Sequence, residues 1–340
     1  MKTVKGLHEK MGTFENANTS FHQAARCKRY TNEVLAFSMV KEEELLRATE
    51  EIQNLTYRQG EYKIFKVFEP KERLIMALPF YDRVVQHMIC NAIQPVFENG
   101  FYYHSYACRS GKGMHAASDT LYQWMYETEV KQGLRMYAFK GDISKYFASI
   151  PHDKLKDENR RYIGDKKALM LMDDIIDHNG ILPDGVGIPV GNLTSQLFAN
   201  VYGNKLDKFC KHVLHIPYFV RYMDDFIILS DDLEQLKEWV KRIEEFLENE
   251  MLLHINPKST ILYAGNGIDF CGYIHYADHK KVRKSSIRKL KQDVKAYELG
   301  KLPPEEFNRK YESRKGHLGH ADTYPVSYTH LRAHETCADL

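Results

Sequence analysis

Two adjacent carboxylates, Asp224 and Asp225, stand inside a strongly apolar run that extends from Ile216 to Ser230. The β-branched and aromatic residues on both sides of this polar break predict a strand, a tight turn and a second strand. The acids would therefore lie at the tip of a hairpin. Carboxylates held between apolar strands are costly unless cations offset their charge. The pair indicates either a metal site or an ordinary polar turn, and a third acid on a similar strand would decide between them.

A third acid, Asp142, ends a short apolar strand that starts near Arg135. A lone Asp at a strand end is usually a helix cap, and Ser144 could share that role. Together with Asp224 and Asp225 it makes three carboxylates on adjacent strand ends, the minimum for two Mg²⁺ ions about 3.5–4 Å apart. Such an arrangement serves in-line phosphoryl transfer.

Three further segments could bind phosphates or bases. A strand, turn and strand around Pro70 place Lys71 and Arg73 at or just past the bend, where they could hold a triphosphate or simply face solvent. The basic loop from Ser105 to His115 is not a phosphate-binding P-loop, because GxxxxGK[ST] is absent. From Gly187 to Asn200 a Gly/Pro turn feeds a helix, and its small residues permit close approach of a backbone or a base.

Periodic patterns predict the elements that must position these residues. Helices are expected over 41–55, from 79 to about 97, and over 233–247. Residues 269–274 are predicted to form one strand whose glycine allows close backbone contact. A polar turn is expected over 315–320.

The basic segment from Lys280 to Lys315 holds 13 Lys or Arg against five Asp or Glu, an excess of eight positive charges. Such an excess is often only a solvated helix face, and Pro303-Pro304 interrupts the helical pattern here. On a domain that also carries an acidic metal-type site, it suggests a polyanionic partner.

Composition excludes several classes of protein. The chain has 340 residues, of which 43% are hydrophobic, enough to bury a core with two or three subdomains. No apolar run reaches membrane-spanning length, and the N-terminus leads into polar sequence, so a membrane protein is not expected and the cytoplasm is the default location. The six cysteines show no CxxC spacing, which argues against a zinc site and a disulfide framework.

The last stretch, residues 326–340, contains a run that resembles the translation of a transposase sequencing adapter. We expect it to be a scar rather than part of the fold, so that the natural C-terminus is missing; the alternative is a genuine short tail.

The motifs occur in the order found in reverse transcriptases, and the resemblance spans roughly residues 1–325. Phe139-Lys140-Gly141-Asp142 resembles the first palm motif, and Tyr222-Met223-Asp224-Asp225 resembles the second. The primer grip of that family is matched by Phe270, Cys271, Gly272 and Tyr273.

The subfamily is indicated by Val190-Gly191-Asn192-Leu193-Thr194-Ser195-Gln196. This segment departs from the QGxxxSP form of group II intron and retroviral enzymes and resembles the [I/L/V]GxxxSQ form of diversity-generating retroelement enzymes. Segments 77–87 and 105–113 resemble the same type. The resemblance implies an error-prone enzyme that copies a template-repeat RNA into cDNA, misincorporates opposite adenines and works with a small basic accessory protein.

The resemblance implies an α+β fold of the right-hand polymerase type, with fingers, palm and thumb and an antiparallel palm sheet flanked by helices. The expected division is an N-terminal helical extension over 1–60, fingers over 61–135, a palm over 136–278 with a fingers part near 155–185, and a truncated basic helical thumb over 279–325.

The resemblance also assigns roles to residues around two Mg²⁺ ions. Asp142 and Asp224 would bind both ions, with the Ile143 carbonyl and Asp225 assisting. Lys258 would donate a proton to pyrophosphate, or is a surface lysine after a proline turn.

On the nucleotide side, the fingers residues Lys71 and Arg73 would clamp the triphosphate. Phe147 lies where the family has an aromatic gate against the ribose 2′-hydroxyl; the alternative is a core aromatic. Val190 would lie under the nascent base pair, and its lack of a hydrogen-bonding side chain is compatible with lowered fidelity. The remaining substrate contacts expected in this motif are Gly191, Ser195 and Gln196.

The expected partners are an RNA template, a DNA or RNA primer and deoxynucleoside triphosphates, with no membrane. Alternative functions are a group II intron-like or phage-defence reverse transcriptase and a non-catalytic, maturase-like RNA-binding protein. Three mutually repelling carboxylates argue against an idle site.

Overall fold

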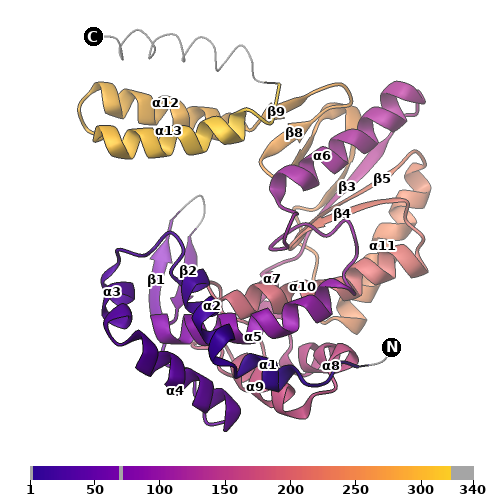
Figure 1. Cartoon of the computed structure of the whole chain (residues 1–340). Coiled ribbons are helices and arrows are strands. Elements are labelled where there is room, and N and C mark those ends of the chain that lie inside the picture. The colour runs from indigo at the N-terminus through magenta and orange to yellow at the C-terminus, as the bar shows by residue number, and fades with distance from the viewer. Residues whose placement is uncertain (1–2, 69–71, 323–340) are drawn as a thin grey trace. The chain divides into compact units, whose positions relative to one another are not determined.

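The structure is a computed structural model that describes residues 3–68 and 72–322 (Figure 1). Helices and strands occur in groups along the chain, an α+β arrangement. The helical elements are α1 (Leu7–Met11), α2 (Phe14–Ala24), α3 (Asn32–Met39), α4 (Lys41–Gln53), α5 (Phe80–Glu98), α6 (Met114–Met125), η1 (Tyr126–Lys131), α7 (Tyr146–Ser149), α8 (His152–Tyr162), α9 (Lys166–Asp177), α10 (Leu193–Lys208), η2 (Phe209–Val213), α11 (Leu233–Glu250), η3 (Ala264–Asn266), α12 (Lys284–Glu298) and α13 (Pro304–Leu318). The strands are β1 (Lys63–Val67), β2 (Arg73–Ala77), β3 (Tyr137–Asp142), β4 (Tyr218–Tyr222), β5 (Asp225–Ser230), β6 (Thr260–Tyr263), β7 (Ile268–Phe270), β8 (Tyr273–His275) and β9 (Lys280–Val282).

The chain divides into two compact units, each assembled from separate stretches. The first unit holds the described chain up to Cys108, with Ile143–His215 and Lys241–Pro257. The second holds Arg109–Asp142, Ile216–Val240 and the chain from Lys258 onward. The predicted palm segment, 136–278, therefore contributes to both units.

The first unit is built around helix α5, which contacts α1, α2, α3 and α10. Its apolar residues recur at helical spacing, so that Val84, Met88, Ile89, Ile93 and Phe97 are all buried. The two-stranded hairpin β1–β2 belongs to the same unit, with Lys63 paired to Ala77 and Val67 paired to Arg73. All five residues of β1 are exposed, so the hairpin depends on other contacts for its position.

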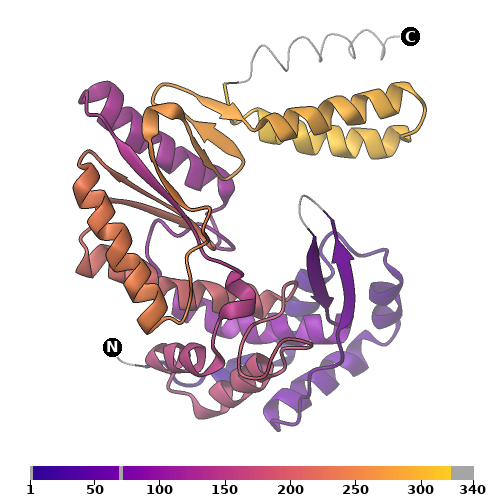
Figure 2. The same cartoon turned by 180° about the vertical axis from the view of Figure 1, so that it is seen from behind.

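The second unit contains a four-stranded sheet in the order β4-β5-β3-β6, with every neighbouring pair antiparallel. A smaller antiparallel sheet, β7-β8-β9, belongs to the same unit, and α6 contacts both β4 and β8. Figures 1 and 2 show α12 and α13 lying side by side in this unit. The antiparallel sheet with flanking helices is the predicted palm arrangement.

Most predicted elements are confirmed, including the helices that appear as α4, α5 and α11 and the strand pairs β1–β2 and β4–β5. Two predictions are wrong. The single strand predicted over 269–274 is a hairpin, because Cys271 and Gly272 have φ values of 48° and 88° and turn the chain between β7 and β8.

The polar turn predicted over 315–320 is mostly helix, since α13 continues to Leu318. Leu318 packs on a buried cluster with Tyr273, Val282 and Leu290. This burial outweighs the weak helix propensity of Gly316.

Lys71 and the adapter-like tail 326–340 lie outside the described residues. Within those residues, no helix is both long and apolar enough to cross a membrane.

Candidate active site

The acidic hairpin forms as predicted, with Tyr222 paired to Asp225 across a two-residue turn of Met223 and Asp224. Met223 has a φ of 59°, in the left-handed region that non-glycine residues rarely adopt. Arg221, which is fully buried, donates a hydrogen bond from Nη1 to the Met223 carbonyl at 2.9 Å. A charge-assisted bond of this kind can hold a strained turn in place.

Strand β3 brings the third acid directly beside this turn. Asp142 pairs with Asp225 in the antiparallel register between β3 and β5. The backbone N–H of Asp142 donates to Oγ of Ser259 at 3.0 Å, so the residue just before β6 fixes the end of β3. The three acids, which are far apart in sequence, thus come from neighbouring strand ends of one sheet.

The charges of the three acids act on one another. Burial, followed by the charges of Asp224 and Asp142, raises the pKa of Asp225 to about 6. The ammonium of Lys140 opposes this increase in pKa, whereas a hydrogen bond with Asp142 adds to it. Lys140 lies two residues before Asp142 on β3, and side chains two apart in a strand share a face. The site therefore concentrates negative charge that a cation would relieve.

Carboxylate oxygens are the ligands that Mg²⁺ prefers, and Mg²⁺ commonly uses one or two carboxylates with several waters and substrate phosphates. The acids Asp142, Asp224 and Asp225 fit this chemistry. In the described part of the chain, however, no group of three His, Cys, Asp or Glu side chains forms a set that could hold a metal ion by itself. Water, backbone carbonyls or phosphates would have to complete the coordination.

Lys258 and the predicted primer-grip segment belong to the same unit as the acids. Lys258 is exposed, next to Ser259. Phe270 and Tyr273 are buried, which leaves the turn at Cys271 and Gly272 as the more accessible part of this predicted primer grip.

The Tyr273 hydroxyl lies 3.0 Å from Nδ1 of His115 and 3.0 Å from Nδ1 of His317. It also donates to the His317 carbonyl at 2.9 Å. A Cβ at Gly272 would lie 3.0 Å from the His317 ring. These contacts hold the β7–β8 hairpin, the predicted primer grip, against α6 and α13.

The predicted nucleotide-side residues belong to the first unit. The Val190 carbonyl accepts a hydrogen bond from the Met76 N–H on β2 at 3.1 Å. Gly191 has a φ of 123°, and a Cβ there would lie 3.1 Å from the Met76 carbonyl oxygen. The close approach predicted for these small residues is therefore made by the backbone of β2. Val190 and Gln196 are half-buried, whereas Ser195 is buried.

Phe147 is half-buried, and its neighbour Tyr146 is the core aromatic, with its hydroxyl donating to the Ala199 carbonyl at 2.6 Å. Arg73 is exposed at the start of β2. Ile143 is buried and bridges to Ile255.

Arg221, Ser259 and Lys140 were not predicted as site residues. The available signal for Arg221 was its position, a charged residue between apolar neighbours one residue before the acidic quartet. Nothing in the sequence singled out Ser259 or Lys140 as site residues, although Ser259 follows Lys258 and Lys140 lies two residues before Asp142. Their roles depend on strand register.

The sequence model of a family described as "Reverse transcriptase (RNA-dependent DNA polymerase)" matches residues 66–275, more than half of the chain. The chain belongs to the reverse transcriptase family. The matched range includes all three acids and the motif from Val190 to Gln196.

Curated relatives of this reverse transcriptase include Protein YkfC of Escherichia coli (strain K12), 25% identical over 251 residues that cover 60% of this chain and 62% of YkfC. A second is the "Uncharacterized 91 kDa protein in cob intron" of Schizosaccharomyces pombe, 29% identical over 137 residues, covering 39% of this chain and 16% of that protein. A third is the "Putative COX1/OXI3 intron 2 protein" of Saccharomyces cerevisiae, 22% identical over 254 residues, covering 56% and 29%. The chain spans less than two thirds of the length of each.

Among solved structures, apo telomerase from Candida tropicalis is similar, with a TM-score of 0.50 at 12% identity. The match covers 64% of this chain and 47% of the telomerase chain. At this identity the likeness supports the fold alone, and that fold is the right-hand polymerase arrangement expected from the sequence.

Proposed function

We propose that this reverse transcriptase is an active RNA-directed DNA polymerase that makes cDNA from an RNA template and deoxynucleoside triphosphates. The observation that carries the proposal is the pairing of Asp142 with Asp225, beside Asp224 in the turn. An idle site has no reason to keep three mutually repelling carboxylates, whose charges together with burial raise the pKa of Asp225.

In the proposed mechanism, Asp142 and Asp224 bind two Mg²⁺ ions, with Asp225 and the Ile143 carbonyl assisting. When bound, Mg²⁺ lowers the pKa of the primer 3′-hydroxyl and neutralises charge on the transferred phosphates. Arg221 holds the turn that carries Asp224, and Ser259 holds the end of β3 that carries Asp142.

Residues outside the acidic cluster handle the nucleotide in this proposal. Arg73 and Lys71 clamp the triphosphate, and Lys258 supplies a proton to the departing pyrophosphate. Phe147 excludes nucleotides that carry a ribose 2′-hydroxyl, and its half-buried position leaves part of the ring available for that contact.

A primer-extension assay with a DNA primer on an RNA template tests the proposal. Asp224→Asn combined with Asp225→Asn should abolish Mg²⁺-dependent extension and leave the protein folded. Asp231→Asn, which removes an exposed carboxylate just after β5, is the matched control and should extend normally. Persistent synthesis by the double variant would overturn the metal assignment, and synthesis absent from the unmodified protein would favour an RNA-binding role.

We further propose that the enzyme is error-prone and serves mutagenic retrohoming in a diversity-generating retroelement, with a small basic accessory protein. The support is the Val190 to Gln196 motif, in which an apolar residue replaces glutamine. Sequencing of cDNA made by Val190→Gln tests the fidelity argument. Errors at template adenines should fall, and an unchanged error spectrum would contradict it.

An intron-type reverse transcriptase is the second candidate, because two of the relatives are named as proteins of introns. Neighbouring genes distinguish the candidates. A template repeat with a matching variable repeat supports the retroelement, whereas flanking intron RNA domains support the second candidate.

A further inference from the structure

Asn192, inside the Val190 to Gln196 motif, does not use its side chain in the usual way for its position. It is the N-cap residue of α10, where an Asn side chain normally accepts a backbone N–H of the first turn. Within the described residues it makes no such capping bond. Its Nδ2 instead donates to the hydroxyl of Tyr62 at 2.9 Å, and the side chain is buried. A helix-capping residue is thus committed to a contact 130 positions away.

The Tyr62 hydroxyl is fully engaged by this contact and two others. It accepts a hydrogen bond from Nε2 of Gln59 at 2.7 Å and donates to the His178 carbonyl at 3.0 Å. Gln59 is itself held by a bond from Nε2 of Gln86 at 3.2 Å. Burial raises the pKa of Tyr62 to about 12, so the hydroxyl keeps its proton under working conditions. One donor and two acceptor positions are the whole capacity of a tyrosine hydroxyl.

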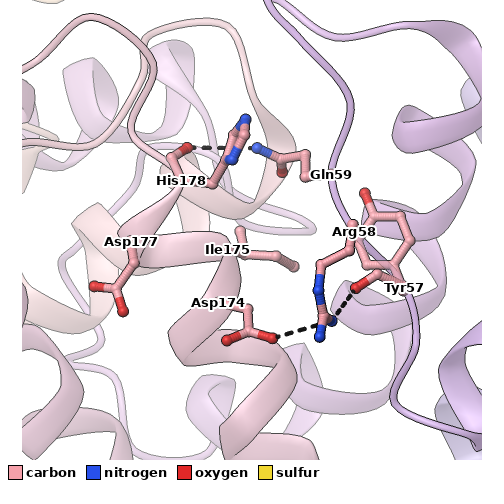
Figure 3. A pocket seen from close by; sticks show the side chains of 7 residues that line it. All are labelled: Tyr57, Arg58, Gln59, Asp174, Ile175, Asp177 and His178. Carbon is pink, nitrogen blue, oxygen red and sulfur yellow. Dashed lines mark hydrogen bonds and ion pairs between the residues drawn. The ribbon is translucent and has the colours of Figure 1, made fainter.

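The surroundings leave the Tyr62 ring little freedom. A Cβ at Gly180 would lie 3.0 Å from Cδ2 of Tyr62, and the ring centroid lies 5.5 Å from that of His178. Figure 3 shows the hydrogen bond that Nε2 of Gln59 donates to the His178 carbonyl; both residues line a pocket together with Arg58 and Asp174. Tyr62 therefore connects two residues that line this pocket, Gln59 and His178, to Asn192 of the motif.

Both strands of the β1–β2 hairpin are tied to the motif through these contacts. Tyr62 immediately precedes β1, and Met76 on β2 donates its N–H to the Val190 carbonyl. Because β1 is exposed along its whole length, these two anchors do much to set the orientation of the hairpin.

We propose that Tyr62 and Asn192 are a positioning pair that holds the hairpin carrying Arg73 in register with Val190, and so sets the affinity for the incoming nucleotide and the accuracy of its selection. This inference rests on the proposed function, in which Arg73 and Val190 contact the nucleotide.

Steady-state primer extension on poly(rA) with an oligo(dT) primer tests the pair. Tyr62→Phe removes only the hydroxyl and leaves the Asn192 donor unpaired. We expect the KM for dTTP to rise about tenfold, with kcat little changed. Asn192→Ala removes the same bond and should raise KM in the same direction. The double variant should be no worse than Tyr62→Phe, because Tyr62→Phe already removes the bond to Asn192 together with those to Gln59 and His178. The error spectrum of the cDNA should shift in the same variants.

Tyr81→Phe is the matched control. Its hydroxyl, in the same unit, donates to Glu51 at 2.7 Å and faces α4, so its loss should leave KM for dTTP unchanged. An unchanged KM in Tyr62→Phe and Asn192→Ala, or an equal rise in Tyr81→Phe, would overturn the proposal.

Hydrogen exchange measured by mass spectrometry separates failure of the pair from failure of the proposed function. Amides of residues 63–68 and 72–77 should exchange faster in Tyr62→Phe than in Tyr81→Phe, whether or not the protein polymerises DNA. Equal exchange would overturn the anchoring role, while an inactive unmodified protein with faster exchange in Tyr62→Phe would overturn only the proposed function.

Discussion

Gly141, one residue before Asp142, offers a sharp test of how the acidic strand ends are held. It pairs with Phe226 on β5, and a Cβ at this position would collide with Cζ of Phe226 and lie 2.6 Å from Cε2. Phe226 is fully buried, with ring centroids 5.8 Å from Phe139 and 6.0 Å from Phe219, so its ring has no space to withdraw. Gly141→Ala must therefore displace strand β3 or β5 at the carboxylates.

Overpacking of a well-filled core costs about 1–3 kcal/mol. For a chain of this size that corresponds to a fall in Tm of roughly 2–10 °C. A shift of strand position near 1 Å between Asp142 and Asp225 can lower a catalytic rate by about 10²-fold. Gly141→Ala should show both losses, measured by thermal unfolding and by kcat for primer extension.

Gly316→Ala provides a control of opposite sign. Gly316 lies inside α13, and among the described residues a Cβ built there would meet no atom within 4 Å beyond its chain neighbours and the backbone of its own helix. Alanine should stabilise this helix by about 0.5–1 kcal/mol and leave kcat unchanged. Phe226→Leu should partly rescue Gly141→Ala, because it removes ring atoms that clash. Wild-type Tm and kcat in Gly141→Ala would refute the packing argument.

Four further outcomes follow from the same geometry. Arg221→Met should raise the Mg²⁺ concentration for half-maximal extension about tenfold, since the turn carbonyl loses a charge-assisted bond, and Arg221→Lys should recover part of this; an unchanged Mg²⁺ titration would contradict the role. Ser259→Ala leaves the Asp142 N–H without its acceptor and should destabilise the protein by about 1–3 kcal/mol and lower kcat, whereas Ser259→Thr should retain both; equal melting curves for Ala and wild type would count against it. Burial and the neighbouring carboxylates raise the pKa of Asp225 to about 6, so the metal-free protein loses stability as pH rises from about 4 to 6. In EDTA, Asp225→Asn should therefore be about 1–2 kcal/mol more stable than the unmodified protein at pH 8 but not at pH 4. A stability difference between the two proteins that does not change with pH would contradict this. Phe147→Ala should admit ribonucleotides in competition assays, and unchanged sugar discrimination would exclude Phe147 as the gate.

The sequence alone determined the local elements and the chemistry of the site. The apolar, β-branched residues around Asp224 and Asp225 predicted the β4–β5 hairpin because strand propensity and turn position depend on near neighbours. The order of the acidic motifs along the chain likewise indicated the family before any contact was known. Helices α4, α5 and α11 were predicted for the same reason, since their apolar periodicity is local.

Only the tertiary structure decided which residues meet. The pairing of Asp142 with Asp225 depends on β3 lying between β5 and β6, and no local pattern specifies that register. Arg221 supports the turn because it is buried and bonds the Met223 carbonyl. Asn192 bonds Tyr62 instead of capping α10 because two segments distant in the sequence meet in the fold. The two wrong predictions, at 269–274 and 315–320, share this cause, because a left-handed turn and burial against Leu290 outweighed local propensity. Propensities contribute tenths of a kcal/mol per residue, whereas burial and buried hydrogen bonds contribute on the order of 1 kcal/mol or more each.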